Sequence, residues 1–218
     1  MSSTAGAQAA VVPEYVEVYD EPRHPTVLEN DYVRVLKVDC HVNQETMFHR
    51  HSQDSFFLFF QTAQIRNEVV GKEPFEVELE AGSFYWGDHL ANPIIHKVCV
   101  GKLALDCMDV EIKSDRPKPT GLFSSLPNTS KRDLCFENDV VRAYRVKLPP
   151  GESIAEVLDA ERGGESKEFP YLAIGMQHAK LSGGEINAGD NWWCGPGMTD
   201  TQSNVGGEET EFMVLQPK

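Results

Sequence analysis

The sequence lacks several features that mark common classes of protein. No apolar run approaches the roughly 20 residues that a membrane-spanning helix needs. The segment MSSTAGAQAA at the start has neither the basic flank nor the apolar stretch of a secretory signal, so we expect a loose tail. The five cysteines are odd in number and form no C-x-x-C pair. Together these absences favour a cytoplasmic protein with reduced thiols.

Positive charge is also scarce. The chain has 20 Lys and Arg against 34 Asp and Glu, a formal charge of -14 and a pI near 4.9. No local cluster of basic residues reverses this balance, so phosphate backbones and anionic lipids would be repelled. The composition argues against nucleic acid and membrane as partners. It leaves a small-molecule substrate or ligand as the expected partner, with a homodimer left open.

An internal repeat is the most informative feature that is present. LENDYVRVLKV at residues 28–38 returns as FENDVVRAYRV at 136–146, an offset of 108 residues in a chain of 218. Each half is long enough to bury a core of its own, which predicts two like-folded halves. We expect a tail (1–14), a first half (15–112), a Pro/Ser/Lys-rich linker (113–133) and a second half (134–218).

Hydrophobic periodicity predicts an all-β fold. In FEVELEAG (75–82), Phe75, Val77 and Leu79 alternate with glutamates, which is typical of a half-buried strand. SFFLFF (55–60) is continuously apolar and suits a strand that is covered on both faces. Gly- and Pro-rich turns separate such segments at short intervals, as in a β-sandwich or barrel.

Three histidines form the candidate site. His49 and His51 are one residue apart on a predicted strand, so both imidazoles point to the same face, as two ligands of one metal ion require. A third ligand must come from another strand, and His96, just after GSFYWG (82–87), is the best-placed candidate. On spacing alone, a chance H-x-H pair on a polar strand face explains the first two equally well.

This pattern resembles the cupin superfamily. His49 and His51 match the histidines of the family's first motif, and Gly82 and His96 match the second motif after an insertion of three residues. The resemblance covers residues 28–112 and, without the ligands, 136–215. It implies two tandem cupin-like β-barrels of the jelly-roll (double-stranded β-helix) type, with a divalent metal ion in the first.

The second half looks degenerate in this comparison. The offset of 108 places Val157 and Asp159 opposite His49 and His51, and Asp200 or Thr201 stands where the third histidine is expected. Conversely, Gly151 supplies a motif glycine that the first half replaces with Asn43. We therefore expect a single metal site, in the first half.

The fourth ligand is open, because Ser55 and Phe56 occupy the places of the motif's acid. Gln53 shares strand parity with His49 and His51 and is the preferred substitute, whereas Asp54 faces away unless a bulge intervenes. His89, in the loop GDHLANP, is the candidate catalytic residue and the runner-up for third ligand.

The other histidines have weaker patterns. His41 enters the cavity only if the chain does not turn after it, and His24 and His178 are expected to be structural or solvated.

Two functions remain in view. The first is a metal-dependent enzyme in which Fe, Mn, Ni, Zn or Cu acts on a small substrate, with dioxygenase-, isomerase- or lyase-like chemistry. The second is a non-catalytic protein that binds a small ligand or serves in assembly. The retained H-x-H and third histidine favour the enzyme, although a shared fold does not decide the chemistry.

Overall fold

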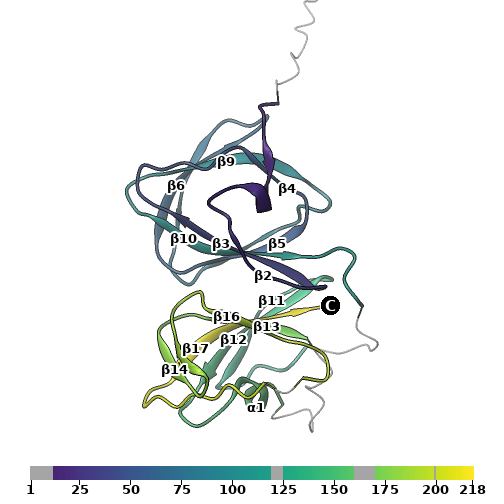
Figure 1. Cartoon of the computed structure of the whole chain (residues 1–218), viewed down its shortest axis with the longest axis vertical. Coiled ribbons are helices and arrows are strands. Elements are labelled where there is room, and N and C mark those ends of the chain that lie inside the picture. Colours follow the sequence, from purple (N-terminus) through teal and green to yellow (C-terminus); the bar gives the residue numbers. More distant parts are fainter. Residues whose placement is uncertain (1–11, 119–124, 160–169, 199) are drawn as a thin grey trace, which may run out of the picture. The chain divides into compact units, whose positions relative to one another are not determined.

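The computed structural model describes residues 12–118, 125–159, 170–198 and 200–218 (Figure 1). Most of the predicted tail (1–14) and the middle of the predicted linker (113–133) lie outside these ranges. Contacts divide the chain into two compact units, unit 1 (Met1–Val27 and Val35–Glu111) and unit 2 (Leu28–Arg34 and Ile112–Lys218). Residues 28–34, which the sequence places in the first half, are grouped with unit 2. The domain boundaries drawn from the sequence stay predictions.

The described chain is almost entirely β, as the periodicity predicts. The strands before residue 113 form two five-stranded sheets (Figure 1). The first sheet has the order β1 (Val16–Glu17), β4 (His49–His51), β9 (Ile94–Val100), β6 (Ala63–Val69) and β7 (Phe75–Leu79). The second has the order β2 (Thr26–Glu29), β3 (Val33–Cys40), β10 (Leu105–Ile112), β5 (Asp54–Phe59) and β8 (Phe84–Gly87). A short 3-10 helix, η1 (Val18–Asp20), follows β1.

The remaining strands form a third five-stranded sheet and a two-stranded one. The third sheet has the order β11 (Arg132–Glu137), β12 (Val141–Leu148), β17 (Thr210–Pro217), β13 (Tyr171–Gly175) and β16 (Asn191–Cys194). The hairpin of β14 (Ala179–Leu181) and β15 (Gly184–Ile186) stands separately.

One helix, α1 (Ile154–Asp159), departs from the period-two interpretation. It begins with a capping box, in which Glu156 N–H donates to Ser153 Oγ and Ser153 N–H donates to the Glu156 carboxylate. The offset of 108 residues sets this helix opposite β4 of unit 1. At the place of the H-x-H pair, the two halves therefore differ in backbone conformation as well as in side chains.

Elsewhere the two repeats adopt the same local structure. The side chains of Asn30 and Asn138 each accept two backbone N–H bonds from the residues that start the next strand. Arg34 and Arg142, which the alternation predicts to face water or an acid, pair with Glu29 and Glu137. The equivalence also extends to a turn, because Asn43 (φ 62°) and Gly151 (φ 85°) both have left-handed backbone conformations. Asparagine tolerates this conformation better than most residues, and glycine adopts it freely.

Each unit has its own apolar core. In unit 1 the buried cluster comprises Val38, Cys40, Phe59, Ala63, Ile65, Val98, Val100, Leu105 and Cys107. In unit 2 it includes Tyr144, Leu148, Ile154, Val157, Tyr171, Phe212 and Val214. Within the described residues, no helix is long and apolar enough to cross a membrane. All five cysteines are free thiols.

Candidate metal centre

Strand alternation places two imidazoles inside unit 1. His49 and His51 on β4 are 0% and 1% exposed, while Arg50 between them pairs with Glu17 on the other face at 2.9 Å. Because side chains two apart on a strand share a face, the H-x-H sequence brings both rings to one side, 5.0 Å apart between centroids.

Sheet register supplies the third imidazole. β9 runs antiparallel to β4 with His96 directly opposite His49, and their ring centroids are 4.5 Å apart. The His51 and His96 centroids are 5.0 Å apart. One ring nitrogen from each histidine lies within 4.8 Å of the others, so His49, His51 and His96 form a group that can hold a metal ion. These are the three residues that the sequence selects.

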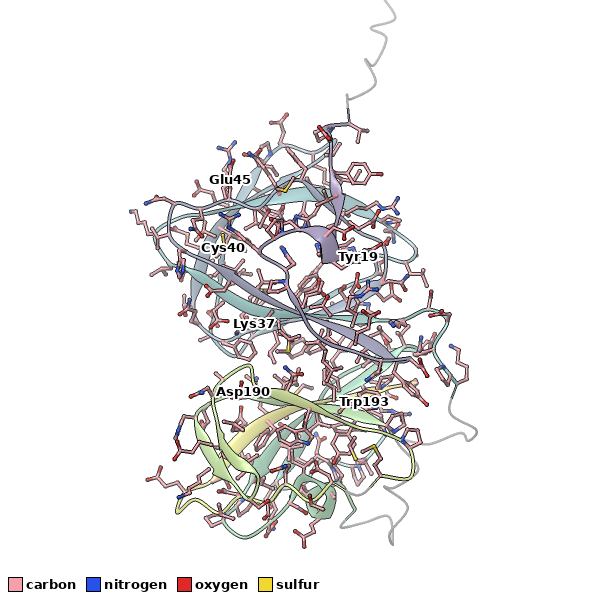
Figure 2. The ribbon with its side chains drawn as sticks, in the orientation of Figure 1. Tyr19, Lys37, Cys40, Glu45, Asp190 and Trp193 are labelled. Atoms are coloured by element: carbon pink, nitrogen blue, oxygen red, sulfur yellow. The ribbon has the colours of Figure 1, made fainter. Side chains whose placement is uncertain are left out.

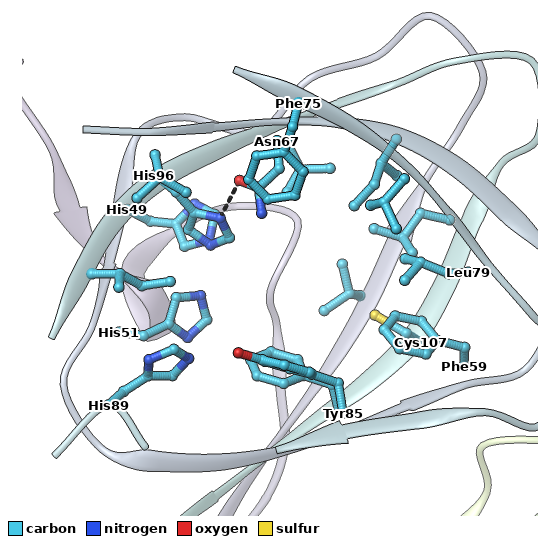
Figure 3. Close-up of a pocket in the computed structure, with 18 of the residues that line it drawn as sticks. His49, His51, Phe59, Asn67, Phe75, Leu79, Tyr85, His89, His96 and Cys107 are labelled. Atoms are coloured by element: carbon cyan, nitrogen blue, oxygen red, sulfur yellow. Dashed lines mark hydrogen bonds between the residues drawn. The ribbon is translucent and has the colours of Figure 1, made fainter. Parts of the chain in front are cut away.

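The outer nitrogen of each ring faces an acceptor. His49 Nδ1 lies 2.9 Å from the Met47 carbonyl oxygen, and His96 Nδ1 lies 2.9 Å from Asn67 Oδ1 (Figure 3). His51 Nδ1 lies 3.4 Å from Asp109 Oδ2. The acceptors beside His49 and His96 place the proton of a neutral ring on Nδ1, which leaves the lone pair on Nε2.

The inner nitrogens fit a metal ion. The Nε2 atoms of His49, His51 and His96 are all buried and have no hydrogen-bond partner among the described residues. Burial of unpaired polar atoms costs about 1–3 kcal/mol each. A divalent ion bound by the three lone pairs would satisfy all of them at once. The three histidines are therefore suited to hold a divalent metal ion.

Burial also keeps the imidazoles of His49 and His96 neutral, which is the form that binds metal. It lowers the pKa of His49 to about 3, and the neighbouring His24 and His51 contribute to the shift. The pKa of His96 is lowered well below its ordinary value, mainly by burial and then by His51 and His49. Near neutral pH, these two histidines therefore require no proton release before binding an ion.

Asp109 is a buried carboxylate behind His51 that the sequence analysis did not select. It lies on β10 and is 0% exposed, and neither of its oxygens has a hydrogen-bond partner among the described residues. A buried anion is costly unless positive charge lies nearby. An ion on the far side of His51 would supply that charge through the imidazole, in the manner of a carboxylate–histidine–metal triad.

We expect Asp109→Asn to weaken divalent-metal binding by about 10–100-fold, because the amide orients and polarises His51 less effectively than the carboxylate does. Calorimetric titration with Zn(II) measures the change. Asp106→Asn is the matched control on the same strand, because Asp106 pairs with Lys37 at a partly exposed site. Lys37 is labelled in Figure 2. Equal affinities for the two variants would remove Asp109 from the centre.

His89 lies at the edge of the same site. It is 5% exposed, and its ring centroid is 5.2 Å from that of His51. Asp54, which is buried, accepts the backbone N–H of Leu90 at 3.0 Å and so holds the loop that carries His89. A Cβ on Gly87 would lie 2.2 Å from the His89 ring, so this close approach requires glycine.

Gln53, the preferred fourth ligand, lies in a bend between β4 and β5 and is not among the residues that line the cavity beside the histidines. The parity argument for Gln53 needs a straight strand from His49 onward, and the bend removes that premise. His41 and His178 are exposed.

His24 is a cavity residue that the sequence analysis set aside. It is 5% exposed, its ring centroid is 4.6 Å from that of His49, and its Nδ1 lies 2.6 Å from Glu21 Oε2. Glu21 also accepts the Met47 N–H at 3.1 Å, which ties this segment to the start of β4. Burial raises the pKa of Glu21, but the bonds from His24 and Met47 outweigh it and leave the pKa below its ordinary value.

Unit 2 lacks these donors at the corresponding places. Val157, opposite His49 by the offset, is in the apolar cluster of unit 2. The carboxylate of Asp200 accepts bonds from the Tyr171 hydroxyl at 2.7 Å and Trp192 Nε1 at 3.0 Å. The side chain of Asp159 lies outside the described residues.

Equivalent ion pairs identify the counterpart of Asp109. Lys37 pairs with Asp106 between β3 and β10, and Arg145 pairs with Glu211 between β12 and β17. This register sets Val214 of unit 2 opposite Asp109, and Val214 is 1% exposed in the apolar core. Unit 2 thus has valine in place of the buried carboxylate as well.

No protein-family model matches the sequence, and a comparison with curated proteins finds no similar one. Solved structures do match. A putative glyoxylate-induced protein from Pseudomonas aeruginosa aligns with a TM-score of 0.53 and 9% identity, over 91% of this chain and 79% of its own. A cupin 2 conserved barrel domain protein from Leptotrichia buccalis aligns with a TM-score of 0.50 and 9% identity, over 88% and 87%.

The oxalate decarboxylase of Bacillus subtilis, which carries Mn(II) centres, also aligns. Its TM-score is 0.50 at 9% identity, over 92% of this chain and 76% of its own. At such identities the likeness establishes the fold alone.

Proposed function

We propose that this chain, whose fold is that of the cupins, is a metalloprotein that holds one divalent ion on His49, His51 and His96. The observation that carries the proposal is the set of three buried, unpartnered Nε2 atoms that lie together in one cavity. Imidazole ligands suit Fe, Mn, Ni, Zn and Cu alike and do not select among them.

The substrate we propose is a small organic molecule that enters the cavity beside the histidines, and the reaction is of the dioxygenase, isomerase or lyase kind. A bound divalent ion supplies Lewis-acid chemistry and, when redox active, activation of dioxygen. His49, His51 and His96 would hold the ion at the cavity that they line, where a substrate could reach it.

His89 would act on the bound molecule from the side of His51. Burial lowers the pKa of His89, with His51 adding to the effect, so its ring is neutral near neutral pH and can accept or donate a hydrogen bond. We assign it the role of orienting the substrate or transferring a proton at the cavity wall, which it lines.

We expect one metal ion per chain, because unit 2 has Val157 and Val214 where unit 1 has His49 and Asp109. Elemental analysis of protein purified without chelator and without a histidine tag gives the stoichiometry and identity of the ion. Calorimetric titration of metal-free protein gives the number of sites. Sub-stoichiometric amounts of every metal, together with no titratable site, would refute the proposal, and two equivalent sites would refute the asymmetry.

A further inference from the structure

The cavity beside the histidines has two chemically different ends. Its volume is about 450 Å³, and of the 22 residues that line it five are histidines and 13 are apolar. Figure 3 shows His49, His51, His89 and His96 together on one side, with Phe59, Leu79 and Cys107 on the other. A ligand that fills this space meets imidazoles at one end and hydrocarbon at the other.

The far end belongs to the apolar core of unit 1. Val38, Phe59, Leu105 and Cys107 are all buried in the same cluster, and Leu79 packs against it. Burial raises the pKa of the Cys107 thiol, so this sulfur stays neutral and behaves as part of an apolar wall. A charged group placed here would lose its hydration and find no compensating hydrogen bond.

The mouth of the cavity is also largely apolar. Phe75 on β7 and Tyr85 on β8 lie on the edge strands of the two sheets and line the cavity, although they are 47% and 57% exposed. Among the described lining residues, Lys72 is the one cationic side chain, and Asp88 offsets it. Large apolar rings left in contact with water at an opening favour an apolar ligand over a highly charged one.

Two buried carboxylates already lie behind the histidine end of the cavity. Asp109 lies behind His51, and Glu21 lies behind His24, and both carboxylates are at most 2% exposed. These two carboxylates can offset a divalent ion at the centre. A ligand that brings two more negative charges would find only Lys72 as a cationic side chain among the described lining residues, with Asp88 opposing it. A ligand whose polar group is neutral or singly charged needs no such additional positive charge.

We infer that the ligand of this cavity is a small molecule with an apolar body and a single oxygen-bearing head that is neutral or singly charged. The inference rests on the proposed function, because the head is placed at the ion held by the three histidines. Small dicarboxylates are disfavoured as ligands of this site.

Straight-chain carboxylates test the inference. We would titrate acetate, butanoate and hexanoate into protein that carries one Zn(II), and compare hexanoate with adipate, which has the same length and a second carboxylate at its far end. We expect affinity to rise about three- to fourfold per added methylene. We expect adipate to bind at least about tenfold more weakly than hexanoate, because its second charge would enter the apolar end.

A pair of variants ties the effect to the cavity. Leu79→Trp fills the far end of the cavity and should abolish the rise in affinity from acetate to hexanoate. Glu78→Trp, on the outer face of the same strand, should leave that rise unchanged. Both should keep one Zn(II) per chain. If Leu79→Trp does not fold, Leu79→Phe makes the same test with a smaller expected loss.

The stoichiometry of Zn(II), measured before any carboxylate is added, tests the metal centre separately from the ligand class. A wild-type protein that binds no zinc refutes the proposed function. A protein that binds one zinc but gives a flat series, or equal affinities for hexanoate and adipate, refutes the ligand class alone. A Leu79→Trp series as steep as that of Glu78→Trp also refutes it.

Discussion

His49→Ala or His96→Ala is expected to abolish divalent-metal binding, with a loss greater than the roughly 10–100-fold that removal of an outer partner causes. Each change leaves two imidazoles, and two ligands do not define a tetrahedral or octahedral site. The apolar core cluster of unit 1 contains neither histidine, so the metal-free variants should fold. Calorimetric titration with Zn(II) gives the affinities.

Thermal unfolding gives a second readout. An ion at 100 times its dissociation constant stabilises the folded state by about 2.7 kcal/mol, so zinc should raise the unfolding midpoint of the wild type and leave those of the two variants unchanged. His41→Ala is the control, because His41 is exposed and should respond as the wild type does. An unchanged zinc response in His49→Ala would remove that residue from the centre.

Arg132→Met is expected to lower the free energy of unfolding by about 3–5 kcal/mol. Arg132 is 1% exposed, and its guanidinium donates to the carbonyl oxygens of Pro127, Val157 and Leu158 at 2.7–3.4 Å. Two of these carbonyls belong to the last turn of α1, where a cation also meets the negative end of the helix dipole. Methionine fills a similar volume but leaves three acceptors unpaired, at about 1–3 kcal/mol each.

The same substitution on the neighbouring strand provides the control. Arg145 pairs with Glu211 at 2.8 Å, but both side chains are about a third exposed, so Arg145→Met should cost no more than about 1 kcal/mol. Urea unfolding of both variants gives the comparison. Equal losses would show that Arg132 contributes as an ordinary surface ion pair does.

The three candidate ligands could be predicted from the sequence because strand geometry is local. Once β4 is a strand, His49 and His51 must share a face, and the position of His96 after a Gly-begun strand suggested an adjacent strand. Gln53 shows the limit of the same reasoning, since parity carries a prediction only as far as the backbone stays extended. The strand β4 ends at His51 and the chain bends at residue 53, so strand alternation no longer predicts the direction of the Gln53 side chain.

The supporting residues could not be predicted in this way. Asn67 and Asp109 come from β6 and β10, and they reach His96 and His51 only because of the order in which the sheets assemble. His24 comes from the segment after η1, and no local pattern marks it as a cavity residue. The helix α1 did carry a signal, the capping box of Ser153 and Glu156, which the strong alternation elsewhere in the chain obscured.

The difference between strand β4 and helix α1 limits where a second histidine pair could be built in this chain. Residues two apart share a face on a strand but diverge by about 200° on an α-helix, so a histidine pair grafted onto α1 would not converge on one ion. Single substitutions on α1 would therefore not create a histidine pair like that of β4, because the backbone of this segment would first have to become extended. The design of a second centre in unit 2 would therefore have to begin with the fold of residues 153–159.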